Sequence, residues 1–249
     1  MMYGRMAGFA GPISPRPFTS GSVIVSTGLI LNYDIGNASS YSGAGSTVTD
    51  LQANSNATLF NTPTYTSSYL TFNGTNQYLT TNTSLNSKLS PANTSKVISI
   101  FLWAYMSDDG VLITELGQTS LNSGWYDSQI ERVAGTLRFS VWSNGTGFAS
   151  TVSTSLNVWY YIGFTYDGTT LRGYVNGAAA GTGTYTRSSP YVNGFGAGLH
   201  YAVAAGTGTS LGDGTYSNMR FGAFQVYNTA LTADQVTTNF QADRSRYGV

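Results

Sequence analysis

Short alternating segments separated by Asn-Gly and Asp-Gly pairs are the feature that most limits how this chain can fold. Residues 159–177 read WYYIGFTYDGTTLRGYVNG. Side chains alternate in character up to the Asp-Gly pair at Asp167, and a second alternating segment then ends at the Asn-Gly pair at Asn176. Both dipeptides accept positive φ at low cost, so they favour a tight turn between antiparallel strands. Such pairs begin at Asn73, Asp109, Asn144, Asp167, Asn176, Asn193 and Asp213.

Alternation with a period of two places successive side chains of a strand on opposite faces. Residues 159–177 therefore predict a meander of two strands. In the first strand Ile162 and Phe164 point to one face and Tyr161 to the other, and in the second strand Leu171 and Tyr174 point to opposite faces. Similar strand patterns occupy residues 22–34, 96–106, 110–116, 127–135 and 136–145, and residues 69–81 predict a hairpin around Asn73-Gly74. Many short strands with such turns favour a sandwich or barrel over a fold of alternating strands and helices.

One helix is expected near the C-terminus, in LTADQVTTNFQAD, residues 231–243. Thr232 is a suitable N-cap, and Gln235 three residues later completes a capping box. Val236 and Phe240 are spaced i, i+4 and form one apolar stripe. The helix is short, so it needs a sheet on which to dock.

Residues 1–21 differ from the rest because three prolines, Pro12, Pro15 and Pro17, leave little that could join a helix or a sheet. We expect an extended arm. It is either a disordered tail or a docking arm that becomes ordered on a partner, with apolar anchors at Met6, Phe9 and Phe18 in addition to the prolines.

The charge balance excludes several partners. The chain has 11 basic and 11 acidic residues, so it lacks the positive charge that holds nucleic acid or an anionic membrane surface. It has no cysteine, which excludes a disulfide scaffold and thiolate metal sites. The longest apolar run, at 97–106, is too short to span a bilayer, and the N-terminus lacks the apolar region of a secretory signal.

The meander at 159–177 resembles the signature of concanavalin A-like, laminin-G-type jelly rolls, in which a Trp starts one strand and Tyr-Val-Asn-Gly closes the next. Three further segments are similar to that family in the right order: GLILNYDIGNASSY (28–41), YLTFNGTNQYLTT (69–81) and MRFGAFQVYNTALTADQVTTNF (219–240). The ending RYG (246–248) resembles the version found in tailed-phage structural proteins. The resemblance implies an all-β, two-sheet antiparallel sandwich over residues 22–249, with one short C-terminal helix.

Nothing in the sequence points to catalysis, and we expect no enzyme. Enzymes of this family carry Glu-x-Asp-x-x-Glu on one strand, whereas the two glutamates here, Glu115 and Glu131, lie on separate predicted strands. A Ser-His-Asp triad would need His200, the one histidine of the chain, and no Gly-x-Ser-x-Gly elbow is present. His200 is otherwise expected in a loop.

Family members often hold calcium on a rim loop, which makes Asp34, Asp50 and Asp213 the candidate ligands here, because each lies in a Gly-, Ser- and Asn-rich predicted loop. The family often has Asp where this chain has Asn73, which lowers the local negative charge. The alternative is that these residues cap turns. The one cofactor expected is therefore calcium.

Lectin-like sites place aromatic rings beside polar groups on loops. The candidates for glycan binding are Trp125, Tyr126, Trp142, His200 and Tyr201, and the alternative is that they pack at an edge or a subunit contact. Trp103, within an apolar run, is expected in the core.

Together these features predict a non-enzymatic structural protein on the surface of a virus particle, in capsid decoration, tail or fibre. The arm would bind neighbouring virion proteins, and the sandwich would face outward as part of a homo-oligomer, for which a trimer is one arrangement. The alternative is a carbohydrate-binding adhesin module that recognises a glycan on a host surface.

Overall fold

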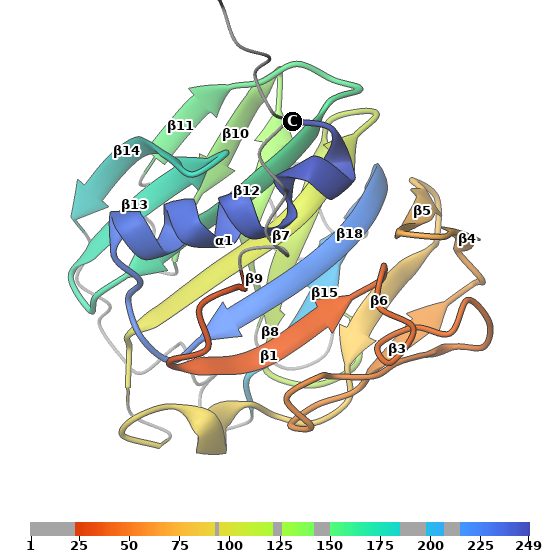
Figure 1. Ribbon diagram of the computed structural model, residues 1–249, viewed down its shortest axis with the longest axis horizontal. Helices are drawn as coiled ribbons and strands as arrows, with labels where there is room; N and C mark the ends of the chain where they lie inside the picture. The colour runs from red at the N-terminus through yellow and green to blue at the C-terminus, as the bar shows by residue number, and fades with distance from the viewer. Residues whose placement is uncertain (1–22, 93–94, 122–125, 142–149, 185–197, 207–214) are drawn as a thin grey trace, which may run out of the picture.

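The computed structural model describes residues 23–92, 95–121, 126–141, 150–184, 198–206 and 215–249. Two eight-stranded antiparallel sheets pack face to face, and one helix lies across the outer face of the first sheet (Figure 1). The predicted two-sheet sandwich with one C-terminal helix is thereby confirmed. The predicted arm, residues 1–21, lies outside the described residues.

The first sheet, sheet A, has the order β14-β13-β12-β7-β18-β5-β4, and β1 also pairs with β18. Its strands are β1 (Leu29–Asp34), β4 (Thr64–Thr66), β5 (Tyr69–Asn73), β7 (Ile98–Met106), β12 (Trp159–Tyr166), β13 (Thr170–Val175), β14 (Ala178–Thr184) and β18 (Asn218–Tyr227). β18 is long enough to pair on one edge with β5 and then with β1, while β7 follows its other edge.

The second sheet, sheet B, has the order β11-β10-β9-β8-β15-β6-β3-β2. Its strands are β2 (Thr47–Val48), β3 (Ala57–Phe60), β6 (Tyr78–Thr81), β8 (Gly110–Leu116), β9 (Tyr126–Val133), β10 (Thr136–Phe139), β11 (Ser150–Ser153) and β15 (His200–Val203). The remaining elements are the two-stranded ribbon of β16 (Ala205–Gly206) and β17 (Thr215–Tyr216), the 3-10 turn η1 (Asn86–Lys88) and the helix α1 (Ala233–Tyr247).

The meander at 159–177 forms as predicted. β12 pairs with β13, and β13 pairs with β14, all antiparallel. At the second turn Asn176 and Gly177 have φ of 51° and 80°, the two positive values that a tight type I′ hairpin turn requires. At the first turn, Asp167 Oδ1 accepts hydrogen bonds from the backbone N–H groups of Thr169 and Thr170, at 3.0 and 2.8 Å.

The hairpin predicted around Asn73-Gly74 is wrong. β5 belongs to sheet A and β6 to sheet B, so the chain crosses between the sheets at this point. Asn73 Oδ1 accepts from the backbone N–H groups of Thr75, Asn76 and Gln77, which holds the crossing in a wider loop than a two-residue turn. The strand at 22–34 is also shorter than predicted and begins at Leu29.

Apolar side chains fill the space between the sheets, where the core includes Ile100 and Leu102 of β7 and Phe164 of β12. A second core lies on the other side of sheet A, under α1. β7 is apolar throughout because both of its faces are covered: Phe101 and Trp103 point away from the sandwich interior and towards the helix. The prediction that Trp103 is a core residue is confirmed, since its side chain is fully buried.

The helix begins as predicted. Thr232 is the N-cap, and the capping box with Gln235 is complete. The aromatic ring of Phe240 lies 5.8 Å from that of Trp103, and the ring of Tyr247 stacks on Trp103 at 4.4 Å. Asn239 is buried, donates to the Tyr227 hydroxyl and accepts from the backbone N–H of Val25 at 2.8 Å. The helix therefore also fixes residues near the start of the described chain.

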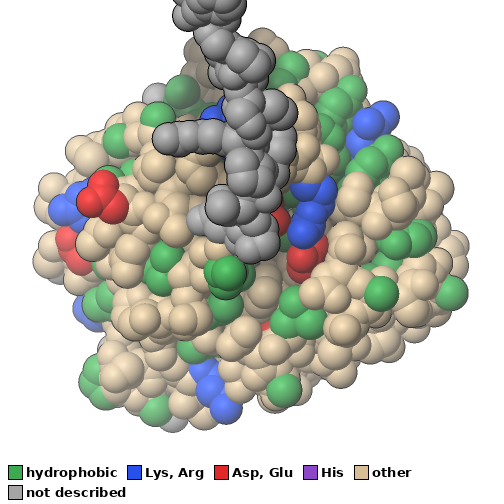
Figure 2. All heavy atoms as spheres, viewed as in Figure 1, with side chains coloured by type: hydrophobic (Ala, Val, Ile, Leu, Met, Phe, Trp, Pro, Cys, Tyr) green, Lys and Arg blue, Asp and Glu red, His purple; other side chains and the backbone are tan. Residues whose placement is uncertain are grey.

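Uncharged polar side chains and backbone make up most of the surface on the helix side, with a few scattered acidic and basic side chains (Figure 2). Within the described residues, no helix combines the length and the apolar sequence needed to span a bilayer.

We predict that Phe240→Ala lowers the free energy of unfolding by about 3 kcal/mol, because the truncation removes buried apolar surface and leaves a cavity beside Trp103. Urea denaturation followed by circular dichroism measures the loss. Thr238→Ala, at an exposed position of the same helix, is the matched control and should change stability by about 0.5 kcal/mol or less. Equal losses in the two variants would show that the helix does not depend on this contact.

Candidate functional site

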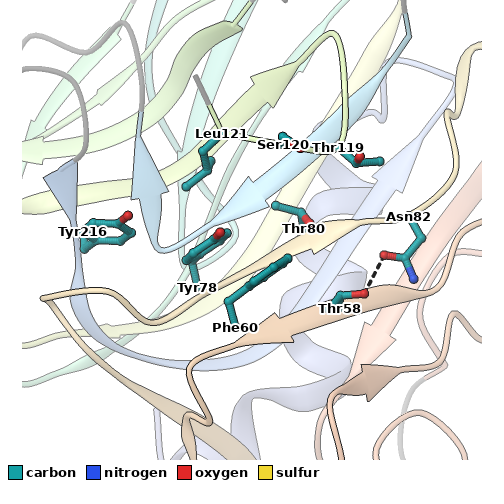
Figure 3. A pocket seen from close by; sticks show the side chains of 9 residues that line it. All are labelled: Thr58, Phe60, Tyr78, Thr80, Asn82, Thr119, Ser120, Leu121 and Tyr216. Atoms are coloured by element: carbon teal, nitrogen blue, oxygen red, sulfur yellow. Dashed lines mark hydrogen bonds between the residues drawn. The ribbon is translucent and has the colours of Figure 1, made fainter. Parts of the chain in front are cut away.

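A pocket of about 430 Å³ opens on the outer face of sheet B, the face turned away from sheet A (Figure 3). Alternation along two neighbouring strands creates it. In β3, Leu59 points into the core, so Thr58 and Phe60 point outward; in β6, Leu79 points inward, so Tyr78 and Thr80 point outward. The volume lies within the range of small-ligand pockets.

Aromatic rings form one wall of the pocket. Phe60 and Tyr78 are directly opposite in the strand register, and their rings stack with centroids 4.4 Å apart and planes 4° from parallel. The ring of Tyr216, on β17, lies 5.8 Å from that of Tyr78. Phe60 and Tyr78 come from paired strands and Tyr216 contacts Tyr78 from β17, so these contacts hold the rings in place before any ligand arrives.

Hydroxyl and amide groups complete the pocket. Thr58 Oγ1 donates to Asn82 Oδ1 at 2.9 Å, which fixes the orientation of the Asn82 amide (Figure 3). Thr80 projects from β6, and Thr119 and Ser120 come from the segment after β8. Each hydroxyl can donate one hydrogen bond and accept two, so the wall opposite the rings offers both donors and acceptors.

The Tyr78 hydroxyl stays protonated at neutral pH. Burial raises its pKa above the ordinary value, and the neighbouring Tyr216 raises the pKa further. A protonated phenol is a hydrogen-bond donor as well as an acceptor. Aromatic faces next to uncharged donors and acceptors suit a ligand with apolar C–H faces and many hydroxyls.

The structure describes the side chains of only two of the predicted glycan-binding residues, His200 and Tyr201. Trp125 and Trp142 lie outside the described residues, and Tyr126 begins β9 with its side chain outside them. The prediction for Tyr201 is wrong, because its side chain is fully buried between the sheets, with its ring 5.5 Å from Phe224. Alternation along β15 directs this side chain inward.

The prediction that His200 lies in a loop is also wrong. It lies in strand β15 instead of a loop, its side chain is 7% exposed, and its Nδ1 is 3.3 Å from the backbone carbonyl of Thr81. It does not line the pocket. Burial lowers the pKa of His200, and the hydrogen bond to Thr81 opposes that effect.

Sequence reasoning missed Phe60, Tyr78 and Tyr216. Phe60 and Tyr78 hold the outward positions of two alternating segments, ATLF and YLTT, and that alternation was the available signal. What the sequence could not show is that these two strands are neighbours, because local alternation does not reveal which segments pair.

Of the predicted calcium ligands, Asp50 has its carboxylate fully engaged. It is 2% exposed, and its two oxygens accept from four backbone N–H groups at 2.8–3.1 Å: those of Asn32, Gln52, Asn54 and Ser55. A carboxylate has about four lone-pair positions, so none is left for a cation. Asp50 thus fits the alternative, a carboxylate that organises its loop.

Asp34 does not fit a cation site either, because it forms an ion pair with Arg246. Asp213 lies outside the described residues. Within the described ranges, no three His, Cys, Asp or Glu side chains gather in a way that could hold a metal ion. Calcium binding stays a prediction.

The two glutamates lie on neighbouring strands of sheet B, Glu115 on β8 and Glu131 on β9, and both are buried. Gln129 donates to Glu115, and Ser128 Oγ donates to Glu131 Oε2 at 3.2 Å. The register pairs Glu131 with Val111, which is four residues before Glu115 on β8. The backbone positions of Glu115 and Glu131 are therefore about 13 Å apart along the strand direction.

The model of one protein family matches residues 72–237, which is 166 of the 249 residues, and its description is the concanavalin A-like lectin/glucanases superfamily. The chain belongs to this superfamily. The predicted resemblance is confirmed at that level, whereas the link to phage proteins stays a prediction. A search of curated proteins finds no match.

Solved structures share the fold at low identity. Trypanosoma rangeli sialidase in complex with sialic acid matches with a TM-score of 0.64 and 17% identity, over 94% of this chain and 35% of the sialidase. The binding domain of botulinum neurotoxin DC in complex with SialylT matches with a TM-score of 0.61 and 13% identity, over 86% of this chain and 51% of that domain. At such identity the likeness shows the fold.

The expectation that the chain is not an enzyme is contradicted by these matches. Structures that share its fold over about nine tenths of its length are sialidases, which are enzymes. The missing Glu-x-Asp-x-x-Glu cluster is therefore no ground for excluding catalysis. The chain spans about a third of the length of these sialidase chains.

We predict that the single histidine makes stability depend on pH. Because burial lowers the folded-state pKa of His200, the unfolded chain binds more protons just below pH 6.5, and stability falls as the pH drops through that window. The slope is at most about 1.4 kcal/mol per pH unit. Urea titrations between pH 7.5 and 5.5 should show this slope in the wild type and a flatter one in His200→Gln. A slope unchanged in His200→Gln would mean that other groups cause it.

We predict that Asp50→Asn lowers the free energy of unfolding by about 3 kcal/mol, because an amide nitrogen would then face backbone N–H donors. Thermal unfolding should show the same loss in calcium and in a chelator. Asp108→Asn, an exposed loop carboxylate, is the control and should stay within about 0.5 kcal/mol of wild type. A loss that appears only in calcium would instead make Asp50 a metal ligand.

Proposed function

We propose that this chain is a carbohydrate-binding domain and that the pocket formed by Phe60, Tyr78 and Tyr216 holds the sugar. The observation that carries the proposal is the stacked pair of rings on the outer face of sheet B, set beside hydroxyl and amide groups. The shape and the chemistry of this pocket together favour a glycan over other small ligands.

A pyranose ring presents a flat apolar face of C–H groups and a rim of hydroxyls. Because the two stacked rings cover each other's facing sides, the C–H face can pack on the free side of the Phe60–Tyr78 pair, while the hydroxyls exchange hydrogen bonds with Asn82 and the Tyr78 hydroxyl. A bound ligand would cover Thr58 and Asn82, whose side chains already share one hydrogen bond. Polar groups that are buried without a partner are costly, so the site favours a ligand that forms hydrogen bonds with the remaining donors and acceptors of this pair.

The comparisons support a sugar ligand at the level of the superfamily. The matched sialidase was solved with sialic acid and the matched neurotoxin domain with SialylT, and these ligands belong to those proteins. For this chain they favour the second of the two functions that the sequence suggests, a module that recognises a glycan on a cell surface, over a purely structural role.

The setting in which the domain acts is a separate proposal. The proline-rich residues 1–21, with apolar anchors at Met6, Phe9 and Phe18, and the ending RYG support a place on the surface of a virus particle. There the arm would attach the domain to neighbouring virion proteins in a homo-oligomer. Several copies would raise the avidity of weak single sites for a glycan-covered surface.

We predict that Tyr78→Ala and Phe60→Ala each weaken glycan binding at least tenfold, because each removes one of the stacked rings. A glycan array with the 249-residue chain identifies the ligand, and isothermal titration calorimetry then measures the dissociation constants. Tyr78→Phe keeps the ring and loses the hydroxyl, so it should lie between wild type and Tyr78→Ala.

Tyr65→Ala is the matched control, because Tyr65 is a partly buried tyrosine of sheet A that does not line the pocket. It should leave binding unchanged. If no glycan binds the wild type, or if Tyr78→Ala and Tyr65→Ala bind equally well, the pocket is not a sugar site.

A further inference from the structure

Among the described residues, none fully covers the part of the outer face of sheet A that lies beside the end of α1. Four side chains on it are each partly exposed, and we call them the aromatic–arginine patch: Tyr69 on β5, Tyr105 on β7, Trp159 on β12 and Arg220 on β18. Figure 2 shows this side of the molecule, where hydrophobic and basic side chains meet at the surface over the first part of β18. The patch lies on the opposite side of the sandwich from the pocket on sheet B.

The patch is rigid. The Arg220 guanidinium carbon lies 4.3 Å from the ring centroid of Tyr105 and 5.2 Å from that of Tyr69. The Trp159 ring lies 5.5 Å from Tyr69 and 5.8 Å from Tyr105, edge-on to both. Contacts of this kind hold side chains in place, so little side-chain entropy is lost when a partner binds.

Below the exposed rings, the patch rests on buried Tyr247, whose ring lies 4.6 Å from that of Trp159. Gly222 makes room for it, since a Cβ at that position would lie 2.6 Å from Tyr247 Cε1. The patch therefore continues directly from the C-terminal turn of α1.

Aromatic rings set edge-on to one another leave shallow slots, the surface that proline-rich segments bind. Such segments favour an extended three-residue helix even when free, so they lose little entropy on docking. The chain has one such segment, GPISPRPF at residues 11–18. Pro12 and Pro15 are three residues apart, so in that helix they project from the same edge.

The segment is close enough to reach the patch. The backbone N–H of Val25 is bound to Asn239, and the eight residues of helix from Asn239 to Tyr247 rise about 12 Å. The ring of Trp159 lies only 4.6 Å further on. Eight extended residues, from Val25 back to Pro17, span about 25 Å. We propose that the aromatic–arginine patch binds residues 12–17 of the same chain, which leaves residues 1–11 of the arm, with Met6 and Phe9, to attach to neighbouring proteins.

The test uses the 249-residue chain with Pro12, Pro15 and Pro17 all changed to Ala, which vacates the patch without altering the sandwich. A fluorescently labelled peptide of residues 8–21 is titrated into this variant and into wild type, with anisotropy as the readout. A tethered segment has an effective concentration of about 1 mM, so a peptide with a dissociation constant of about 0.1 mM should bind wild type about tenfold more weakly than the variant.

Three controls decide the outcome. Adding Tyr105→Ala, or separately Arg220→Gln, to the vacated chain should weaken peptide binding at least tenfold, and circular dichroism confirms that each variant is folded. A peptide with the three prolines changed to Ala should bind at least tenfold more weakly. Adding Tyr78→Ala should change nothing, which separates this site from the proposed sugar pocket.

Equal binding to wild type and to the vacated chain would overturn the proposal, because the patch would then not be occupied by its own segment. Binding that survives both patch substitutions, or that ignores the loss of the prolines, would overturn it as well. A wild-type protein whose mass rises with concentration, with the triple variant staying monomeric, would assign the segment to a neighbouring copy and overturn docking within one chain.

Discussion

The stack of Tyr247 on Trp103 joins the two ends of the described chain to the middle of sheet A. Trp103 projects from the central strand β7, and Tyr247 lies at the end of α1, so their contact brings the helix onto the sheet. With Tyr247 in place, the adjacent Arg246 reaches Asp34 at the end of β1. This aromatic contact thus helps to align the C-terminal helix with the first strand.

Local pattern predicted the elements well, because turn chemistry and side-chain alternation act over a few residues. The Asn176-Gly177 turn, the two faces of β12 and the Thr232 capping box all appear as expected. The segment at 69–81 shows the limit of that reasoning. Asn73-Gly74 has the composition of a tight hairpin, yet pairing with β18 on one side and β3 on the other places its two strands in different sheets.

The candidate site was harder to predict because it depends on which strands are neighbours. Tyr201 and Tyr78 have the same residue type and both lie in alternating segments, but one faces the core and the other the solvent. Only the register of β3 with β6 brings Phe60 beside Tyr78. Asp50 shows the same dependence, since the four backbone groups that surround its carboxylate come from two separate segments.

The hydrogen bond from the Val25 backbone N–H to Asn239 holds the start of the described chain on the helix side of the sandwich. Residues at the start of the described chain and Val249 at its end both contact the core under the helix, whereas the pocket opens through the opposite sheet. A larger body joined directly after Val249 would therefore lie on the helix side of the sandwich, opposite the pocket. Such a module can be carried on many different supports, or in several copies on one support, with every pocket directed away from the point of attachment.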